Sequence, residues 1–283
     1  ERGSTDVHVT HGDKTGDWSY LLETVQRSAR GFKDIDRSNR DTGFDIEDYV
    51  GKLRWQGNRQ SVTAKLQYSE ETSNASYLGL TDADFERDPD RRYGLSSIDQ
   101  MNNEHYSVNL THQFAWTDSL SSTATLYHNW FERNWFKLDG GGSFVDDAND
   151  GDANAQGILD GAVDVTDLDY KNNNREYVSE GVQVNFDLDL GAHQLAFGTR
   201  YHEDEMDRFQ PVDVYDQVNG SLVFQNTVAP TGSNNRFETG EALSFWVLDK
   251  WQATDRLNLN FALRYEDVET SRTQYADATR ATI

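Results

Sequence analysis

Residues 105–131 alternate between two kinds of side chain, and this alternation constrains the fold more than any other feature of the chain. Large or apolar residues recur at every second position of the first arm: Tyr106, Val108, Leu110, His112, Phe114 and Trp116. Polar residues fill most of the positions between them, and a period of two is typical of a β-strand with one apolar face. Thr117 and Asp118 predict a tight reversal, after which residues 120–131 repeat the pattern. The segment is therefore predicted to be one long β-hairpin.

The length of the two arms indicates a membrane strand rather than a strand of a soluble sheet. Strands of soluble sheets usually span about five or six residues, whereas a tilted strand needs roughly 9 to 11 residues to cross a bilayer. Long polar segments at residues 73–102 and 137–173 flank the hairpin on the side away from its short turn. Short turns on one side and long loops on the other are typical of an outer-membrane β-barrel.

Four more hairpins follow from the same reasoning. They cover residues 6–24, 45–68, 177–201 and 242–265, with turns at 12–17, 57–58, 191–192 and 253–255. The arm at residues 242–251 is apolar on both faces, and its Asp249 would point outward. All three prolines lie outside the predicted strands, as a ladder of backbone hydrogen bonds requires. The fold is thus predicted to be all-β, an antiparallel up-and-down transmembrane barrel of about ten strands with short periplasmic turns and long extracellular loops.

Four tryptophans support this assignment because each lies near a short turn on the predicted outward face. They are Trp18, Trp55, Trp116 and Trp251. An indole ring has an apolar body and a polar N–H, so it suits the interface between membrane and water. These residues predict an aromatic belt at the periplasmic rim.

Composition narrows the function. The chain has 283 residues, no cysteine and a formal net charge of −23, and no apolar run is long enough for a membrane helix. The mean hydropathy of −0.81 is compatible with a barrel, because only alternate strand residues would face lipid. So acidic a chain is not expected to bind nucleic acid, and no nucleophile elbow or distinctive carboxylate pair suggests an enzyme.

The segment at residues 255–266 resembles the recurring strand of TonB-dependent outer-membrane receptors, with a polar turn, an alternating strand and a final Arg264-Tyr265-Glu266. The loops at residues 76–93 and 129–136 are similar to loops of the ferric citrate and ferric siderophore receptors of that family. The resemblance implies a bacterial outer-membrane barrel of about 22 strands, closed by an N-terminal plug. Residues 1–283 are then expected to be a partial barrel, with the plug and the C-terminal strands absent.

The resemblance also implies a function and partners. The expected function is uptake of a ferric siderophore or another ferric chelate, driven by the TonB complex through the missing plug, with no cofactor. Outer-membrane lipid and lipopolysaccharide would surround the barrel. Two alternatives stay open, namely a passive porin-like or structural barrel and a soluble extracellular β-protein that binds glycans.

If the resemblance holds, ligand contacts come from the long loops. Arg91, Arg92 and Tyr93 could receive an anionic chelate, because arginine offers a planar fork that pairs with carboxylates. Local pairing with the neighbouring aspartates at positions 88 and 90 is the simpler alternative. Trp135 and Phe136 could form an aromatic lid, or they could belong to the outer aromatic girdle.

Five basic residues share the predicted inward parity and could line the lumen: Lys52, Arg54, Lys65, Arg200 and Arg264. Salt bridges to inward acids such as Glu23, Asp187 and Glu266, or contacts with the plug, are the alternative. No metal site is predicted, because the acidic run at residues 146–152 has Ala148 and Gly157 where an EF-hand loop needs ligands. These loop acids are expected to be solvated, or to bridge through divalent cations to anionic lipid head groups.

Overall fold

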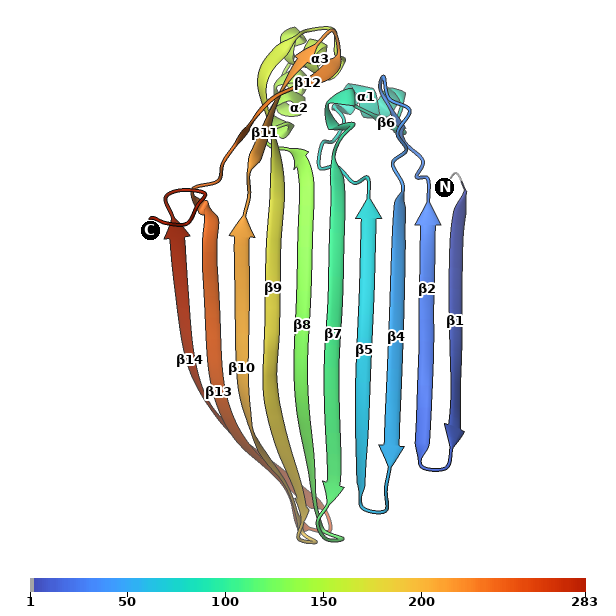
Figure 1. Cartoon of the computed structure of the whole chain (residues 1–283), viewed down its shortest axis with the longest axis vertical. Coiled ribbons are helices and arrows are strands. Elements are labelled where there is room, and N and C mark those ends of the chain that lie inside the picture. Colours follow the sequence, from blue (N-terminus) through green and yellow to red (C-terminus); the bar gives the residue numbers. More distant parts are fainter. Residues whose placement is uncertain (1–2) are drawn as a thin grey trace.

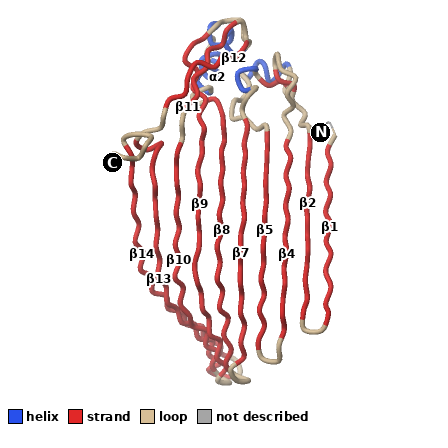
Figure 2. The backbone as a smooth tube through the Cα atoms, viewed as in Figure 1, coloured by secondary structure: helices blue, strands red, loops and turns tan. Residues whose placement is uncertain are grey.

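A computed structural model describes residues 3–283 as one large antiparallel sheet with a cap of loops and short helices at one end (Figures 1 and 2). The strands are β1 (Ser4–Thr15), β2 (Trp18–Ala29), β3 (Asp34–Ile35), β4 (Phe44–Gln56), β5 (Gln60–Ser73), β6 (Arg91–Arg92), β7 (Gln100–Ala115), β8 (Leu120–Leu138), β9 (Val165–Asp189), β10 (His193–Phe209), β11 (Val212–Val218), β12 (Ser221–Val228), β13 (Gly232–Thr254) and β14 (Leu257–Tyr275). The helices are α1 (Asp82–Arg87), the 3-10 helix η1 (Gly94–Ser96), α2 (Gly142–Asn149) and α3 (Ala153–Leu159).

Ten long strands form the sheet in the order β1-β2-β4-β5-β7-β8-β9-β10-β13-β14, and each pairs antiparallel with its neighbours. The short turns gather at the lower end of Figure 1, whereas the helices and the β11–β12 hairpin gather at the upper end. The prediction of an up-and-down antiparallel sheet of about ten strands in a partial barrel is therefore confirmed.

The strands are longer at the loop end than predicted. The predicted loop at residues 137–173 contains the end of β8 and the start of β9, and β11 and β12 were not predicted. Beyond the bilayer a strand has no lipid-facing side, so the alternation that identifies membrane strands disappears there. The first turn is also shorter than predicted, because Gly12 stays in β1 and Gly16 takes the positive φ of 58° that the reversal needs.

The register places the predicted outward residues opposite one another on one face of the sheet. Leu110 pairs with Leu126, and the next pair of strands continues the row because Leu126 lies opposite Val182. Phe186 and Phe197 stack at 5.2 Å between ring centres on the same face. Large apolar side chains are exposed along this face, as expected of a surface that contacts lipid.

The periplasmic end of this face carries the predicted tryptophans. Trp18 lies directly opposite Trp55, and Trp116 packs edge to face on its neighbour Phe114. The structure also gives the register of residues 242–251, the predicted arm that is apolar on both faces. Asp249 lies on the lipid-facing side, and its carboxylate lies 2.8 Å from the ring of His193. The prediction that Asp249 points outward is thus confirmed.

The extracellular end of the same face is marked by two straight rows of side chains. The first row is aromatic: Tyr49, Tyr68, Tyr106 and Trp130 are direct cross-strand neighbours. The second row consists of carboxylates and lies two positions closer to the loops on each strand: Glu47, Glu70, Glu104, Glu132, Glu176 and Asp207. The Tyr49 hydroxyl donates to Glu47 at 2.9 Å, and the Trp130 indole N–H donates to Glu176 at 2.8 Å. The carboxylate row, as we call it, ends the apolar band.

We expect arginine at position 110 to destabilise the folded protein in lipid by about 2–4 kcal/mol, because Leu110 lies midway between the two rims on the lipid-facing side. Arginine at position 111 should have little effect, since Thr111 lies on the opposite face and pairs with Thr125. The free energy of unfolding of the full-length protein in vesicles tests both. Equal effects of Leu110→Arg and Thr111→Arg would contradict the assignment of the faces.

The extracellular connections pack into a cap with an apolar core of its own. Seven buried side chains form this core: Tyr93, Leu95, Leu138, Ile158, Leu159, Leu168 and Tyr170. They come from the β5–β7 connection, the β8–β9 connection and the ends of β8 and β9. Within residues 3–283, every helix is too short and too polar to cross a membrane. The cap is a folded unit rather than a set of independent loops.

Candidate functional site

Four arginines form a straight row across neighbouring strands near the extracellular end of the sheet. Arg133 of β8 lies opposite Arg175 of β9, which lies opposite Arg208 of β10, which lies opposite Arg236 of β13. Their parity places them on the face away from lipid. Adjacent strands are about 4.8 Å apart, so this arginine ladder spans about 14 Å.

The charge of the ladder is largely unbalanced within the chain. Like charges directly opposite one another destabilise a sheet, yet Arg133, Arg175 and Arg208 make no ion pair with a carboxylate of residues 3–283. The Nε atoms of Arg133 and Arg175 are buried and have no hydrogen-bond partner in that range. Only Arg236 has an acidic partner, Glu238, at 3.1 Å. In a chain of net charge −23, such a row favours an anion as its partner.

Aromatic pairs lie on both sides of the ladder on the same face. On the periplasmic side, Phe131 and Tyr177 are cross-strand neighbours and stack at 6.0 Å between ring centres. On the extracellular side, Trp135 stacks on Tyr77 at 4.0 Å, and the Lys137 ammonium lies 4.1 Å from the centre of the Tyr77 ring. The site therefore combines a row of guanidinium groups with flat apolar surfaces above and below it.

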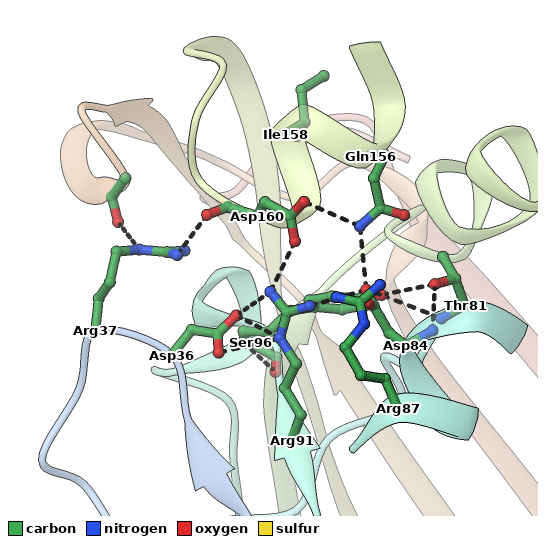
Figure 3. A network of polar contacts seen from close by, with 12 residues as sticks. Asp36, Arg37, Thr81, Asp84, Arg87, Arg91, Ser96, Gln156, Ile158 and Asp160 are labelled. Carbon is green, nitrogen blue, oxygen red and sulfur yellow. Dashed lines mark hydrogen bonds and ion pairs between the residues drawn. The ribbon is translucent and has the colours of Figure 1, made fainter. Parts of the chain in front are cut away.

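The structure places the predicted ligand residue Arg91 inside the cap, where three loops meet (Figure 3). Its guanidinium contacts Asp36 at 2.8 Å, Asp84 at 2.9 Å and Asp160 at 2.7 Å. The hydrogen bond with Asp36, helped by Asp160 and Asp84, holds the pKa of Arg91 above its usual range. Asp36 and Asp160 come from other connections and Asp84 from the same one, and none of the three is one of the adjacent aspartates that the sequence suggested.

Arg92 and Tyr93 are buried in the same cap. The Arg92 guanidinium donates to the backbone oxygens of Asn74 and Ser96, and burial lowers its pKa. Tyr93 is 1% exposed, and its hydroxyl donates to Asp84 at 2.6 Å. Burial raises the pKa of this hydroxyl. Both side chains hold the loops together in this conformation, and their contact with a ligand stays a prediction.

The two predicted lid residues point to opposite sides of β8. Trp135 faces the ladder side, where its indole N–H donates to the Ala75 backbone oxygen at 3.2 Å. Phe136 packs against the cap core, with its ring 5.8 Å from that of Tyr170. Only Trp135 therefore lies beside the arginine ladder, and neither residue belongs to the aromatic row on the lipid-facing side.

The predicted lumen residues share the face of the ladder but lie nearer the periplasm: Lys52, Arg54, Lys65, Arg200 and Arg264. Arg264 pairs with Glu266 at 2.7 Å, as the salt-bridge alternative predicts. Arg200 donates to the Tyr127 hydroxyl at 3.0 Å, and Lys52 lies opposite Lys65. These residues are spread over several strands and make no continuous row comparable to the ladder.

The ladder was not predicted from the sequence. Its four arginines are far apart along the chain, and all four lie outside the segments that were predicted to be strands. The pairing of β8, β9, β10 and β13 at their extracellular ends is what aligns them. The arginines could have been found by continuing each predicted strand beyond its apolar residues while keeping the same register with its neighbours.

A buried carboxyl group supports the aromatic stack above the ladder. Asp99 is 1% exposed, and it accepts hydrogen bonds from the Ser76 hydroxyl at 2.7 Å and from the Leu138 backbone N–H at 3.0 Å. Burial raises the pKa of Asp99 to about 6, although these hydrogen bonds and the nearby Arg92 and Lys137 oppose the shift. The Asp99 carboxyl group consequently changes its protonation state at mildly acidic pH, about 6.

We expect the cap around Asp99 to lose stability as the pH rises from about 4 to about 7. The pKa is about 6 in the folded state and about 3.9 when unfolded, so burying the ionised form costs up to about 3 kcal/mol at neutral pH. Hydrogen exchange of the Leu138 amide, corrected for the chemical exchange rate, should be slower at pH 5 than at pH 7.5. Asp99→Asn should remove most of this difference, and an unchanged pH profile in that variant would contradict the assignment.

Comparison with known proteins gives the family and the fold. A family model described as "TonB dependent receptor-like, beta-barrel" matches residues 34–282. No protein with curated annotation matches the sequence. Similar solved structures include the siderophore receptor PiuA from Acinetobacter baumannii, with 11% identity, a TM-score of 0.69 and coverage of 98% of this chain and 43% of that chain.

Two other solved structures are similar in the same way. The ferripyoverdine receptor of the outer membrane of Pseudomonas aeruginosa has 11% identity and a TM-score of 0.65, and the match covers 98% of this chain and 37% of that one. The ferric citrate transporter FecA has 14% identity and a TM-score of 0.64, covering 96% of this chain and 35% of the other. The chain thus spans less than half the length of the structures it matches, and identities this low show the fold alone.

Proposed function

Since this chain belongs to the TonB-dependent receptor β-barrel family, we propose that it is the part of an outer-membrane receptor that binds and admits a negatively charged ferric chelate. Its structural neighbours include a ferric citrate transporter, a siderophore receptor and a ferripyoverdine receptor. Transport would be driven by the TonB complex acting through a plug domain.

The arginine ladder is the observation that carries this proposal. Three of its four guanidinium groups have no acidic partner in residues 3–283, and they lie on the face away from lipid, directly below the cap. Arginine pairs with carboxylate and similar oxyanions through two parallel hydrogen bonds, and such charge-assisted bonds are strong. A chelate with several acidic groups would satisfy the row, and its apolar parts would pack on the neighbouring aromatic pairs.

Of the residues predicted from sequence, Trp135 is the one that we propose contacts the ligand directly, because it borders the ladder. Contact with Arg91, Arg92, Tyr93 or Phe136 would require the cap to rearrange, since each is now engaged in it. The five lumen residues nearer the periplasm would meet a ligand only after it passes the ladder, or would contact the plug.

Binding of a panel of ferric chelates to the full-length receptor tests the proposal. The panel should contain ferric citrate, an anionic ferric catecholate and a cationic ferric hydroxamate, each with its iron-free form. We expect one or more anionic chelates to bind, with an affinity that falls as salt rises. Binding of none of them would contradict iron uptake, and uptake that persists without TonB would favour a passive barrel.

A further inference from the structure

The side chain of Arg37 lies in a seat made by three glycines from three other loops. Its Nε donates to the Gly220 backbone oxygen at 3.1 Å, and its Nη1 donates to the Asp160 backbone oxygen at 2.6 Å (Figure 3). A Cβ atom on Gly94 would lie 2.5 Å from the Arg37 Nη2 atom, and one on Gly220 would lie 2.8 Å from Nε. A Cβ on Gly161 would overlap the same guanidinium. One side chain therefore touches three glycines at once.

These contacts join four connections that are far apart in sequence. Arg37 belongs to the β2–β4 connection, Gly94 to the β5–β7 connection, Gly161 to the β8–β9 connection and Gly220 to the β11–β12 turn. Arg37 itself has a φ of 56°, an unfavourable backbone conformation for a residue with a side chain. The surrounding contacts must hold it there, because nothing in its own backbone preference does.

Gly94 is a glycine whose absent side chain leaves room for the Arg37 guanidinium. Gly161 and Gly220 have φ of 71° and 74°, so their backbone conformation alone favours glycine. Gly94 has no such φ, and its missing side chain is explained by the space that the Arg37 guanidinium and the Asp36 backbone oxygen occupy. The close fit at Gly94 is thus a steric requirement of the seated arginine and of the Asp36 backbone beside it.

A second set of contacts, made by Arg91, also joins the loops of the cap and is less exposed to solvent. Arg91 binds Asp36, Asp84 and Asp160 with a side chain that is 17% exposed, and the short β3–β6 pair adds backbone hydrogen bonds beside it. Arg37 is exposed, and its hydrogen-bond partners within residues 3–283 are neutral carbonyl oxygens. Charge-assisted, half-buried bonds are harder to break than exposed bonds to neutral acceptors.

We infer that Arg37 is a latch for the extracellular cap. Seated, it holds the β2–β4 connection and the β11–β12 hairpin against the rest of the cap, so that four connections behave as one body. Its withdrawal is the first step of cap opening, because it parts the β11–β12 turn from the β2–β4 connection. The Arg91 contacts still hold the β2–β4 connection, and the apolar core still holds the β11–β12 hairpin, so the rest of the cap stays intact. The latch does not depend on what the receptor binds.

Distance measurements between spin labels in the full-length receptor test this inference. Since the chain has no cysteine, labels can be placed at the exposed positions Asn39 and Gln225, on the two segments that Arg37 joins. Arg37→Ala removes the latch, and Gly94→Ala fills the seat without changing the charge. Gly79→Ala is the matched control, because a Cβ there meets nothing within 4 Å and Gly79 lies in the same connection as Gly94.

We expect a narrow distance distribution in the unsubstituted receptor and in the Gly79 variant. The Arg37 and Gly94 variants should both shift toward longer and broader distances, while hydrogen exchange in the Leu159 and Tyr170 core stays slow. Unchanged distances in both variants would overturn the latch. Loss of core protection together with the shift would also overturn it, because the cap would then melt as a whole rather than release one contact.

Discussion

Replacing Arg133 and Arg175 together with alanine should weaken binding of an anionic ferric chelate to the full-length receptor at least about a hundredfold, because each charge-assisted hydrogen bond contributes roughly 1.5–3 kcal/mol. These two guanidinium groups lie between the two aromatic pairs of the site and have no acidic partner in residues 3–283. Titration of the purified receptor with the chelate measures the loss. The effect should shrink at high salt, where the wild-type affinity itself falls.

The same double variant should fold as well as the unsubstituted protein. Directly opposed arginines repel one another, so their removal relieves repulsion and is expected to leave the free energy of unfolding equal or slightly higher. Arg59→Ala is the matched control, since Arg59 is exposed near a periplasmic turn and pairs with Asp118 at 3.4 Å. Undiminished binding by the double variant would contradict the ladder as the ligand site.

Replacing Arg91 with methionine should open the extracellular cap, with a local cost of up to about 3–5 kcal/mol, the usual range when one partner of a buried ion pair is removed. The Asp84 side chain is only 2% exposed, and Arg91 lies 2.9 Å from it. Burial alone would raise the pKa of Asp84, but the hydrogen bonds from Tyr93 and Gln156, together with Arg91 and Arg87, keep it below its ordinary value. Without Arg91, that carboxylate stays buried with less compensation.

Hydrogen exchange resolved by residue distinguishes this local effect from loss of the barrel. The amides of α1 and η1 should exchange faster in Arg91→Met, whereas those in the middle of β7 and β8 should keep their protection. Arg87 still contacts Asp84 at 3.1 Å, so the cost should fall toward the lower end of the range. Arg87→Met provides the comparison, because its exposed side chain should contribute much less. Equal effects of the two substitutions would contradict the central role of Arg91.

The sheet was predictable wherever the chain faces lipid. Between the two rims each strand must place apolar side chains on one face, and the alternation around Leu110 or Leu263 records this requirement directly. The order of the strands followed from the short turns, which allow only neighbouring antiparallel pairs. The outward position of Asp249 could also be predicted from its place in the alternation, although residues 242–251 are apolar on both faces and show no clear alternation.

The site was less predictable because it depends on alignment across strands and on contacts between loops. Arg175 and Arg208 are 33 positions apart, and only the β9–β10 register makes them neighbours. The partners of Arg91 come from three connections, and local sequence pointed instead to the adjacent acids. Loop packing follows from side-chain shape and from a small apolar core, and neither has a simple period along the chain.

The carboxylate row also limits how far each strand can slide past its neighbours during assembly. Moving one strand by two residues toward the periplasm would carry its acid to the level of the tyrosines, where a carboxylate loses its hydration. Tyr106 of β7 and Trp116, which directly follows β7, are ten residues apart, which corresponds to about 25 Å of membrane for a tilted strand. Slippage of a strand toward the periplasm thus meets a polar stop at the extracellular rim, and six side chains on neighbouring strands set how deeply this part of the wall is immersed.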